Sequence, residues 1–312
     1  MKVSLITTAL NEENSIKFFL DSVLKQTKLP EELIIVDGGS TDRTVESIKY
    51  YVLSINRIKI RLIVKRGNRS VGRNIAIKNS TGDIIAVSDS GCILDKNWIA
   101  KITRPFSDKN VDVVAGYYKG KAKNIFQKCL IPYVLVMPDK LDAKTFLPSA
   151  RSMAMRKSVW KKTGGFPEKY SHNEDYVFSR MLKRSNAIIF FAKSAIVYWL
   201  PRENINESFI MFFRFAFGDA EAGIWRPKVM LLYLRYIFGI ALVILYLNTK
   251  SNLLLFIIYY LFVTYILLSI LKNYKYVNHP MAFLYLPVLQ LVSDAAVILG
   301  MSYGIIKRIM RK

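Results

Sequence analysis

A long uncharged stretch near the C-terminus restricts the possible folds of this chain more than any other feature. Residues 253–271 contain no charged side chain and are long enough for an α-helix to cross the hydrocarbon core of a membrane. Residues 281–306 form a longer apolar run that contains Asp294, and residues 229–247 form another that contains Arg235. The sequence therefore predicts three transmembrane helices, at about 229–247, 253–271 and 281–306.

Two charged features leave a second topology open. Arg235 either extends to the membrane surface or places its helix at the interface. After three spans the basic tail would lie outside the cell, against the positive-inside tendency, whereas two spans and one interfacial helix would keep it inside; the tail consists of Lys307, Arg308, Arg311 and Lys312. Length favours three spans. Because the first residues show no secretory signal, we expect the N-terminal domain on the cytoplasmic side of the cell membrane.

An aromatic segment precedes these helices. Residues 209–217 contain five phenylalanines around Arg214, which is typical of a helix in the membrane interface. Residues 125–137 are also apolar, but Pro132 interrupts them and they are too short to span. We therefore expect a polar domain over residues 1–205, an interfacial amphipathic segment over 206–228 and the membrane helices over 229–312.

The charge balance and the cysteine count exclude several classes of protein. Lys and Arg outnumber Asp and Glu by 46 to 23, which favours phosphate-bearing partners such as nucleotides or anionic lipids. No recognisable nucleic-acid-binding module accompanies this charge, so we expect no nucleic-acid partner. Two cysteines and two histidines at unrelated positions predict neither a disulfide framework nor a zinc site.

Strand and helix patterns alternate along the N-terminal half. Apolar runs of strand length lie at residues 3–8, 33–36, 60–64 and 83–87, and helical periodicity lies between them at 15–26, 44–53 and 71–79. This order predicts an α/β domain with a parallel, doubly wound sheet. Beyond residue 105 the pattern loosens, and we expect strands at 149–155, 187–192 and 195–199 and a helix at 175–183.

Three polar clusters follow three of the predicted strands, at residues 7–12, 37–42 and 89–91. Ligands of such sheets bind at the carboxyl ends of the strands, so the clusters should converge on one crevice. Carboxylates there, Glu12 and Asp37, can accept hydrogen bonds from a nucleobase and a ribose. Asp89 is suited to a divalent cation that is shared with a diphosphate.

Further charged residues suit phosphate binding and proton transfer. Arg66, Arg69 and Arg73 lie before and within a predicted helix, and arginine is well suited to phosphate recognition. Glu174 and Asp175 open a later helix, where an acidic residue can simply compensate the helix dipole. Alternatively, one of them is a general base that removes a proton from an acceptor hydroxyl.

In this order and spacing, the motifs resemble those of glycosyltransferase family 2, whose members have the GT-A fold and use nucleotide-diphospho-sugars. Residues 8–13 (TALNEE) resemble the opening motif of that family, and residues 36–44 (VDGGSTDRT) resemble its second motif. Residues 72–74, 81–83, 164–166 and 173–175 resemble its later short motifs, so the resemblance covers residues 3 to about 200. It implies a GT-A domain followed by C-terminal transmembrane helices.

The resemblance implies a role for each matching position. Asp175 would be the base for direct displacement at the anomeric carbon with inversion, and the adjacent Glu174 is the alternative. Asp89 would hold Mg²⁺ or Mn²⁺. The other predicted donor-binding residues are Thr8, Ala9, Asn11, Glu12, Asp37, Gly39, Arg66, Arg73, Ser88 and Ser90. Arg214 and Asp219 resemble a segment that precedes the membrane helices of some members.

The chain departs from the family pattern at three motifs. In the motif at residues 36–44, Gly38 replaces an acid. Gly91 replaces the second acid of the metal motif, so the cation would depend on Asp89, the diphosphate and water. The acceptor motif Gln-x-x-Arg-Trp is absent from the sequence, which argues against a processive polysaccharide synthase.

The resemblance and the membrane helices together predict transfer of a single sugar to a membrane-borne acceptor, such as a lipid-linked glycan. Two other functions remain open, a polyprenyl-phosphate sugar synthase and a catalytically inactive nucleotide-binding scaffold.

Overall fold

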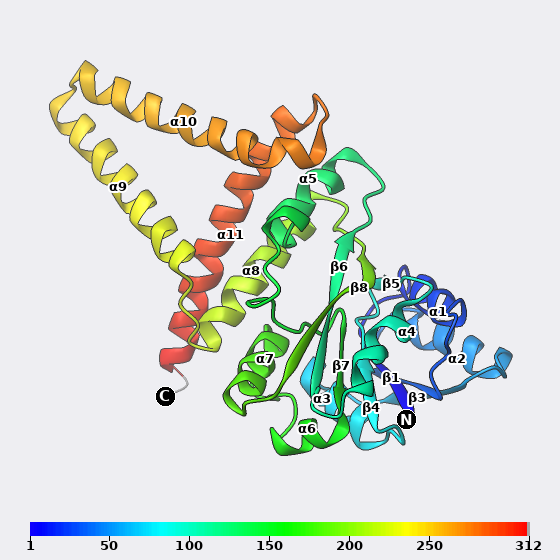
Figure 1. Cartoon of the computed structure of the whole chain (residues 1–312). Coiled ribbons are helices and arrows are strands. Elements are labelled where there is room, and N and C mark those ends of the chain that lie inside the picture. Colours follow the sequence, from blue (N-terminus) through cyan, green and yellow to red (C-terminus); the bar gives the residue numbers. More distant parts are fainter. Residues whose placement is uncertain (311–312) are drawn as a thin grey trace. The chain divides into compact units, whose positions relative to one another are not determined.

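The computed structural model describes residues 1–310, and the chain folds into two compact units. The first unit contains Met1–Lys121 and Val136–Leu200, and the second contains Ala122–Leu135 and Pro201–Lys312 (Figure 1). Arg311 and Lys312, which belong to the predicted basic tail, lie outside the described residues.

The described residues of the first unit form an eight-stranded sheet with the order β3-β2-β1-β4-β7-β6-β8-β5. Its first half is parallel, as the alternating pattern predicts. These four strands are β1 (Val3–Ala9), β2 (Glu32–Asp37), β3 (Lys59–Val64) and β4 (Ile84–Val87). The strands β1, β2 and β4 are almost entirely buried, and polar loop residues follow each of them.

The second half of the sheet is mixed, which corrects the expectation of a parallel sheet throughout. β7 (Met153–Arg156) is antiparallel to β4 and to β6 (Val113–Gly120), and β5 (Cys92–Leu94) is antiparallel to β8 (Ile189–Trp199). The strand expected at 149–155 begins later, because Ser149 and Ser152 pair across a turn.

The two short strands expected at 187–192 and 195–199 are one strand, β8. It runs parallel to β6, with a register shift at Gly116/Tyr117 that leaves residues 193–195 of β8 outside the ladder. A bulge of this kind interrupts the alternation of side chains without ending the strand, which is why the sequence pattern suggests two strands.

Helices cover the sheet and complete its core. They are α1 (Ile16–Leu24), α2 (Thr44–Ser54), α3 (Arg69–Lys78), α4 (Trp98–Thr103), α6 (Lys157–Lys162) and α7 (Glu174–Arg184), with short 3-10 turns η1 (Arg104–Ser107) and η2 (Pro138–Lys140). Ala76 and Ile77 of α3 pack with Phe178 and Leu182 of α7 in one buried cluster with the central strands. This packing holds α3 and α7 against the sheet, and both helices carry predicted site residues.

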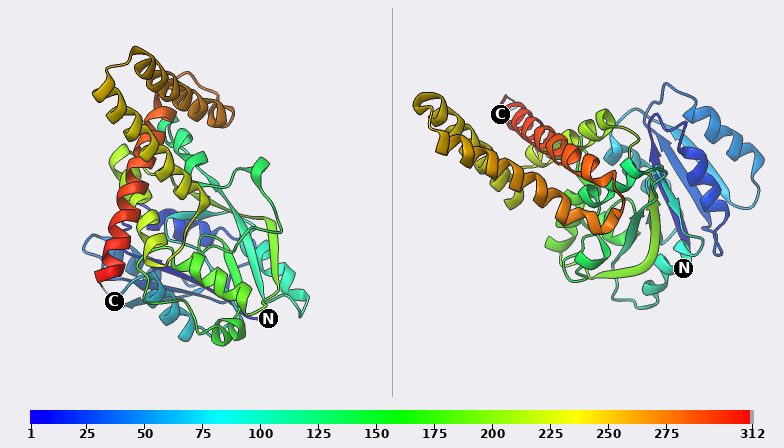
Figure 2. Two further views of the ribbon diagram at one scale, coloured as in Figure 1. Left: turned by 90° about the vertical axis from the view of Figure 1, so that its left-hand side faces the viewer. Right: turned by 90° about the horizontal axis from the view of Figure 1, so that it is seen from above.

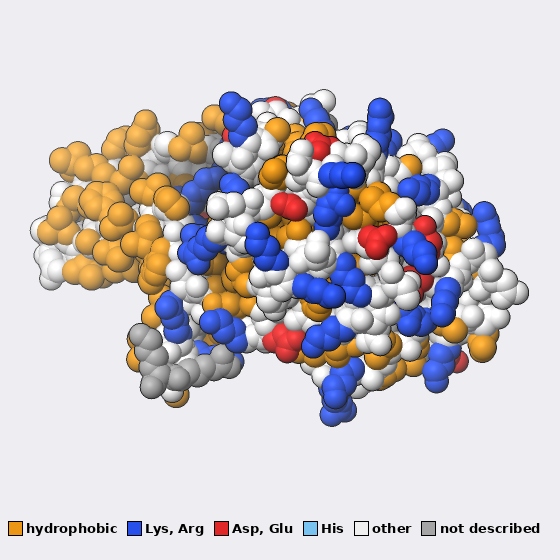
Figure 3. Space-filling view, turned by 60° about the horizontal axis from the view of Figure 1, so that its bottom comes forward, with side chains coloured by type: hydrophobic (Ala, Val, Ile, Leu, Met, Phe, Trp, Pro, Cys, Tyr) orange, Lys and Arg blue, Asp and Glu red, His pale blue; other side chains and the backbone are white. Residues whose placement is uncertain are grey.

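The second unit is helical. It consists of α5 (Ile125–Val134), α8 (Ile205–Glu221), α9 (Pro227–Thr249), α10 (Asn252–Val277) and α11 (Ala282–Met310). Within residues 1–310, α9, α10 and α11 are the three helices long and apolar enough to cross a membrane, as predicted but with wider bounds. Figure 3 shows their apolar side chains gathered together, whereas Lys and Arg are spread over the surface of the first unit.

Two segments of the second unit extend the predicted pattern. Residues 125–134 form a helix despite Pro132, and α8 extends beyond the aromatic run at both ends. Asn124 and Asn204 cap these helices, since each side chain accepts a hydrogen bond from the backbone N–H three residues later.

Candidate functional site

The loop after β2 is built around Asp37. This side chain is buried, and its carboxylate accepts hydrogen bonds from the backbone N–H groups of Gly39 at 2.9 Å and Ser40 at 2.8 Å and from the Ser40 hydroxyl at 2.5 Å. Gly39 has φ +98°, and a Cβ at this position would lie 2.8 Å from Cγ of Arg66. Glycine is therefore required both for the turn and for the close approach of Arg66.

The loop after β1 is tied to the loop after β2. Asn11, in the left-handed region at φ 54°, receives a hydrogen bond from the Thr41 N–H, and its own N–H donates to Ser40 Oγ. The Glu12 N–H donates to Thr44 Oγ1 at 2.7 Å. In the register of the parallel strands Ala9 lies beside Asp37. The first two predicted clusters therefore converge.

The third cluster joins them through backbone contacts. The Ser90 hydroxyl donates to the carbonyl of Thr8 at 3.0 Å, and the Ser88 hydroxyl donates to the carbonyl of Arg151 at 2.9 Å. All three strand ends thus lie at one edge of the sheet, in agreement with the geometry that the strand order predicts.

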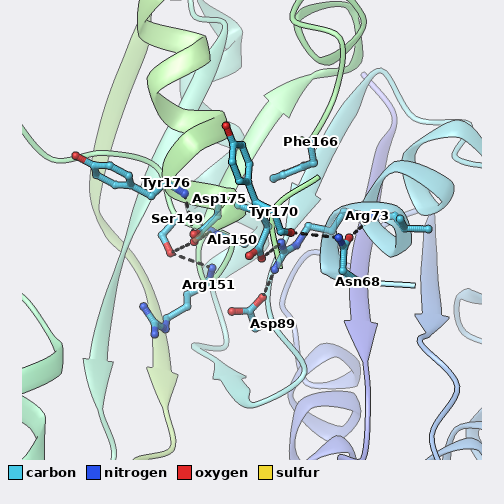
Figure 4. A network of polar contacts seen from close by, with 12 residues as sticks. Asn68, Arg73, Asp89, Ser149, Ala150, Arg151, Phe166, Tyr170, Asp175 and Tyr176 are labelled. Carbon is cyan, nitrogen blue, oxygen red and sulfur yellow. Dashed lines mark hydrogen bonds and ion pairs between the residues drawn. The ribbon is translucent and has the colours of Figure 1, made fainter. Parts of the chain in front are cut away.

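Arg73 connects the third cluster to the acidic pair at the start of α7. Its side chain is 2% exposed, with Nη1 2.6 Å from Glu174 Oε1 and Nη2 2.9 Å from Asp89 Oδ1 (Figure 4). The guanidinium also lies over the Phe166 ring, 5.4 Å from its centroid. Burial alone would lower the pKa of Arg73, but the charges of Glu174, Asp89 and Asp175 outweigh it and raise that pKa.

The two acids at the start of α7 differ in their surroundings. Glu174 is 3% exposed and paired with Arg73. Asp175 is half-buried, and its Oδ2 accepts hydrogen bonds from Ser149 Oγ at 3.0 Å and the Ala150 N–H at 3.2 Å. Figure 4 shows Ser149, Ala150 and Asp175 on one side of the Arg73–Asp89 pair. These two donors and the Tyr176 N–H, which donates to Asp175 Oδ1 at 2.8 Å, fix the orientation of Asp175. Glu174 is instead held in its ion pair with Arg73.

Neighbouring arginines lower the pKa of the Asp89 carboxyl. Burial would raise the pKa of this carboxyl, but the guanidinium groups of Arg73, Arg69 and Arg151 hold the pKa below its usual value. Its side chain is 36% exposed, so one face of the carboxylate remains accessible.

The residues around Asp89 suit a cation that takes most of its ligands from elsewhere. Among the described residues no group of three His, Cys, Asp or Glu could hold a metal ion. A Cβ at Gly91 would meet Glu12 Oε2 at 4.0 Å, so the position of the missing second acid is open. A single carboxylate is compatible with Mg²⁺, which commonly binds through one or two carboxylates, substrate phosphates and water.

Arg151 belongs to this site although the sequence pattern does not predict it. Its guanidinium lies 5.5 Å from the Tyr118 ring centroid and 5.8 Å from that of Trp199, and it makes no side-chain hydrogen bond within residues 1–310. Burial would lower the pKa of Arg151, but Tyr118, Asp89, Cys92 and Asp175 raise it. Figure 4 shows this side chain beside Asp89 and Asp175. Its position just before β7 is the feature of the sequence by which Arg151 could have been predicted as a site residue.

Comparison with known proteins supports the family that the motifs resemble. The sequence model described as "Glycosyl transferase family 2" matches residues 4–162. The glycosyltransferase GlyG of Streptococcus pneumoniae is 28% identical over 116 residues, which are 37% of this chain and 38% of that protein. The O-antigen chain rhamnosyltransferase RfbN of Salmonella typhimurium is 26% identical over 227 residues, which are 67% of this chain and 71% of that protein.

Solved structures share the fold. The mannosyltransferase PcManGT from Pyrobaculum calidifontis, in complex with GDP-Man and Mn²⁺, has a TM-score of 0.66 at 15% identity and covers 95% of this chain and 87% of its own. TarS 1–349 of S. aureus in complex with UDP-GlcNAc has a TM-score of 0.51 at 22% identity and covers 69% of this chain and 66% of its own. At these identities the likeness establishes the fold alone.

Proposed function

Because this chain belongs to glycosyl transferase family 2, we propose that it moves a single sugar from a nucleotide-diphospho-sugar to a membrane-borne glycan acceptor, with inversion at the anomeric carbon. The family makes the chain a glycosyltransferase. The acceptor class, the stereochemistry and the residue roles are our proposal.

The arrangement around Asp175 carries this proposal. A carboxylate held by the Ser149 hydroxyl and the Ala150 N–H has one fixed orientation, as a general base requires. In the proposed reaction the acceptor hydroxyl gives its proton to Asp175 while its oxygen bonds to the anomeric carbon. The bond from that carbon to the diphosphate breaks on the opposite face, which inverts the configuration.

The departing diphosphate needs positive charge. Arg151 and Arg69 lie close enough to Asp89 to affect its pKa, and we propose that they face the phosphates. A divalent cation at Asp89, when bound, would neutralise further charge on the diphosphate. The nucleoside would lie over the first two strand-end loops, with Thr8, Glu12 and Asp37 beneath it.

The membrane-borne acceptor is supported by the helices and by one relative. Three helices suited to a bilayer follow the α/β unit, and RfbN is named for an O-antigen chain. An enzyme held at a membrane reaches lipid-linked substrates without leaving the surface.

Transfer of radiolabelled sugar into a solvent-extractable product tests the proposal. The full chain in membranes is incubated with UDP-, GDP- and dTDP-sugars and with lipid-linked glycan or bare polyprenyl phosphate. Labelled glycan from one donor supports the proposal, whereas label on polyprenyl phosphate alone identifies the synthase alternative. Nucleotide binding without transfer across the panel identifies an inactive scaffold.

A further inference from the structure

Helices α9 and α11 of the second unit run in opposite directions. The Tyr233 hydroxyl, early in α9, donates to the carbonyl of Ile298 at 2.9 Å and lies 2.8 Å from Ser302 Oγ, both late in α11. Tyr236, further along α9, donates to Asp294, which comes earlier in α11, at 3.1 Å. Residues later in α9 therefore contact residues earlier in α11, which means that the two helices are antiparallel.

Helix α10 also runs opposite to α11. Tyr265 in the middle of α10 donates a hydrogen bond to Asp294. Further along α10, Tyr274 packs on Phe283 near the start of α11, with ring centroids 5.1 Å apart.

Helices α9 and α10 reverse direction over the two residues between Thr249 and Asn252. They meet again where the Arg235 guanidinium lies 4.0 Å from the Tyr265 ring centroid. Each of the three helices therefore runs in the direction opposite to both of the others. Three nearly parallel rods cannot do this, so the axes form a closed triangle, and Figures 1 and 2 show the corner between α9 and α10 standing away from α11.

A triangle of helices cannot cross a bilayer on all three sides. Membrane-spanning helices tilt by about 20° on average and by up to about 40°. If all three crossed, two would cross in the same direction, and their axes would lie within about 80° of each other. Here every pair runs in opposing directions, so at most two of the three helices cross with an ordinary tilt.

The contacts of α11 identify it as the helix that does not cross. It packs along α8, where a Cβ at Gly300 would overlap the Phe213 carbonyl oxygen and one at Gly304 would lie 2.6 Å from Ala220 Cβ. Such close packing binds the two helices together. Helix α8 is not itself among the candidate spans and has polar positions along its length, including Arg214. By contrast, α9 and α10 expose most of their apolar side chains.

Charge at the corners of the triangle supports the same assignment. Lys228 begins α9, Lys272 and Lys275 end α10, and Lys307 and Arg308 end α11, so these cations flank both ends of α11. The opposite corner contains Lys250. Basic residues gather on one side of a membrane and bind anionic headgroups there.

The lengths of the helices fit a bilayer. At 1.5 Å per residue, α9, α10 and α11 are about 34, 39 and 43 Å long, and a triangle with these sides has its apex about 29 Å above α11. The hydrocarbon core is about 30 Å thick. Arg235 and Asp294, 3.1 Å apart, then form a neutral pair inside the triangle, which reduces the cost of placing charge there.

We propose that α9 and α10 form a V-shaped hairpin that crosses the bilayer and returns, while α11 lies along the membrane surface beside α8. The occupant of the exposed apolar faces is the hydrocarbon core, and anionic headgroups face the cations around α11. Because α8 does not cross, the chain enters α9 on the membrane side where it left the α/β unit, and it returns to that side after the hairpin.

Labelling of single introduced cysteines tests this topology, and the experiment does not depend on enzymatic activity. Ser251→Cys marks the corner between α9 and α10, Met310→Cys marks the exposed end of α11, and Lys109→Cys marks an exposed loop of the first unit. Each variant of the full chain is treated with a membrane-impermeant maleimide in right-side-out and in inverted vesicles. The parent chain, in which Cys92 and Cys129 are buried, gives the background.

We expect Lys109→Cys and Met310→Cys to react in the same vesicles and Ser251→Cys to react in the others. If Met310→Cys reacts on the side opposite to Lys109→Cys, α11 crosses and the proposal is wrong. If Ser251→Cys reacts on the side of Lys109→Cys, the hairpin does not cross, which also overturns it. Protease cleavage of the unsubstituted chain at Lys307 and Arg308, followed through a C-terminal tag, repeats the comparison if a cysteine variant does not accumulate.

Discussion

The Arg73 guanidinium lies 2.6 Å from the Glu174 carboxylate, and both side chains are buried. Such a pair is costly to break, because removal of one partner leaves a charge without compensation. Glu174 is therefore held in the fold, while the adjacent Asp175 is oriented by three hydrogen-bond donors and remains half-buried.

This difference predicts separable effects of two isosteric substitutions. Asp175→Asn should lower the rate of sugar transfer by about 100-fold or more, since a general base contributes about that much, and should leave folding intact. Glu174→Gln should retain most of the transfer rate but lower the unfolding temperature. Initial rates and thermal denaturation of both variants check this. Transfer by Asp175→Asn at the rate of the unsubstituted chain would show that another group is the base.

Arg151 should contribute to donor binding through its charge. Hydrogen bonds that involve a charged group contribute about 1.5–3 kcal/mol, so Arg151→Gln should weaken the binding of a nucleoside diphosphate by about 10- to 100-fold. Arg151→Lys retains the charge and should lose less. Calorimetric titration with and without Mg²⁺ measures the effect. Equal affinity in Arg151→Gln and the unsubstituted chain would place the diphosphate elsewhere.

A second carboxylate at the open position of the metal motif should strengthen cation binding. A Cβ at Gly91 would meet Glu12 Oε2 no closer than 4.0 Å, so Gly91→Asp fits and adds a hard oxygen ligand. We expect the Mn²⁺ concentration for half-maximal donor binding to fall by about tenfold. Asp89→Asn should abolish the response to Mn²⁺, and an unchanged midpoint in Gly91→Asp would place the cation away from residue 91.

Acid should destabilise the first unit partly through Glu32. Burial would raise the pKa of this carboxyl, but hydrogen bonds from Thr81 and Ser4 and the charge of Arg61 lower it below its usual 4.5. A lowered folded-state pKa stabilises the fold fully above the unfolded value, and this contribution disappears as the pH falls through the folded value. Glu32→Gln should therefore be less stable at neutral pH and lose less stability between about pH 5 and pH 3. Parallel acid-dependence curves for both proteins would contradict this.

The contact between α8 and α11 should be sensitive to one methyl group. A Cβ at Gly300 would overlap the Phe213 carbonyl oxygen, whereas one at Gly239 would meet nothing within 4 Å. Overpacking costs about 1–3 kcal/mol, so Gly300→Ala should lower the unfolding temperature in detergent micelles. Gly239→Ala, in an uncrowded helix position, should be neutral or slightly stabilising. If both variants unfold at the same temperature, the two helices are not closely packed.

The parallel half of the sheet and the positions of its polar loops could be predicted from the sequence. The strands that precede these loops are buried apolar runs followed by polar residues, and parallel strands bring their ends to one edge. That is why the loops containing Glu12, Asp37 and Asp89 converge as expected. The predicted roles of these residues in donor binding and catalysis stay predictions.

The other half of the site depends on pairings between distant segments. Arg73 and Glu174 are separated by about a hundred residues, and no local pattern reports an ion pair between them. Arg151 is positioned by Tyr118 and Trp199, which belong to strands that are not adjacent in the chain. The triangular arrangement of α9, α10 and α11 could not be predicted from the lengths of the apolar segments. It depends on contacts between side chains that are distant in the sequence.

The segment 122–135, which contains α5, has a consequence for biosynthesis. The chain leaves the first unit after Lys121 and re-enters it at Val136, and the residues between them belong to the helical unit. Tyr133 donates to the carbonyl of Leu286 at 2.7 Å, and Phe126 packs on the Tyr285 ring. Tyr285 and Leu286 leave the ribosome long after α5 does. The apolar surface of α5 therefore stays exposed to solvent while the sheet is completed. A shortened, water-soluble form that ends near Leu200 would keep that surface exposed unless residues 122–135 were replaced by a polar turn.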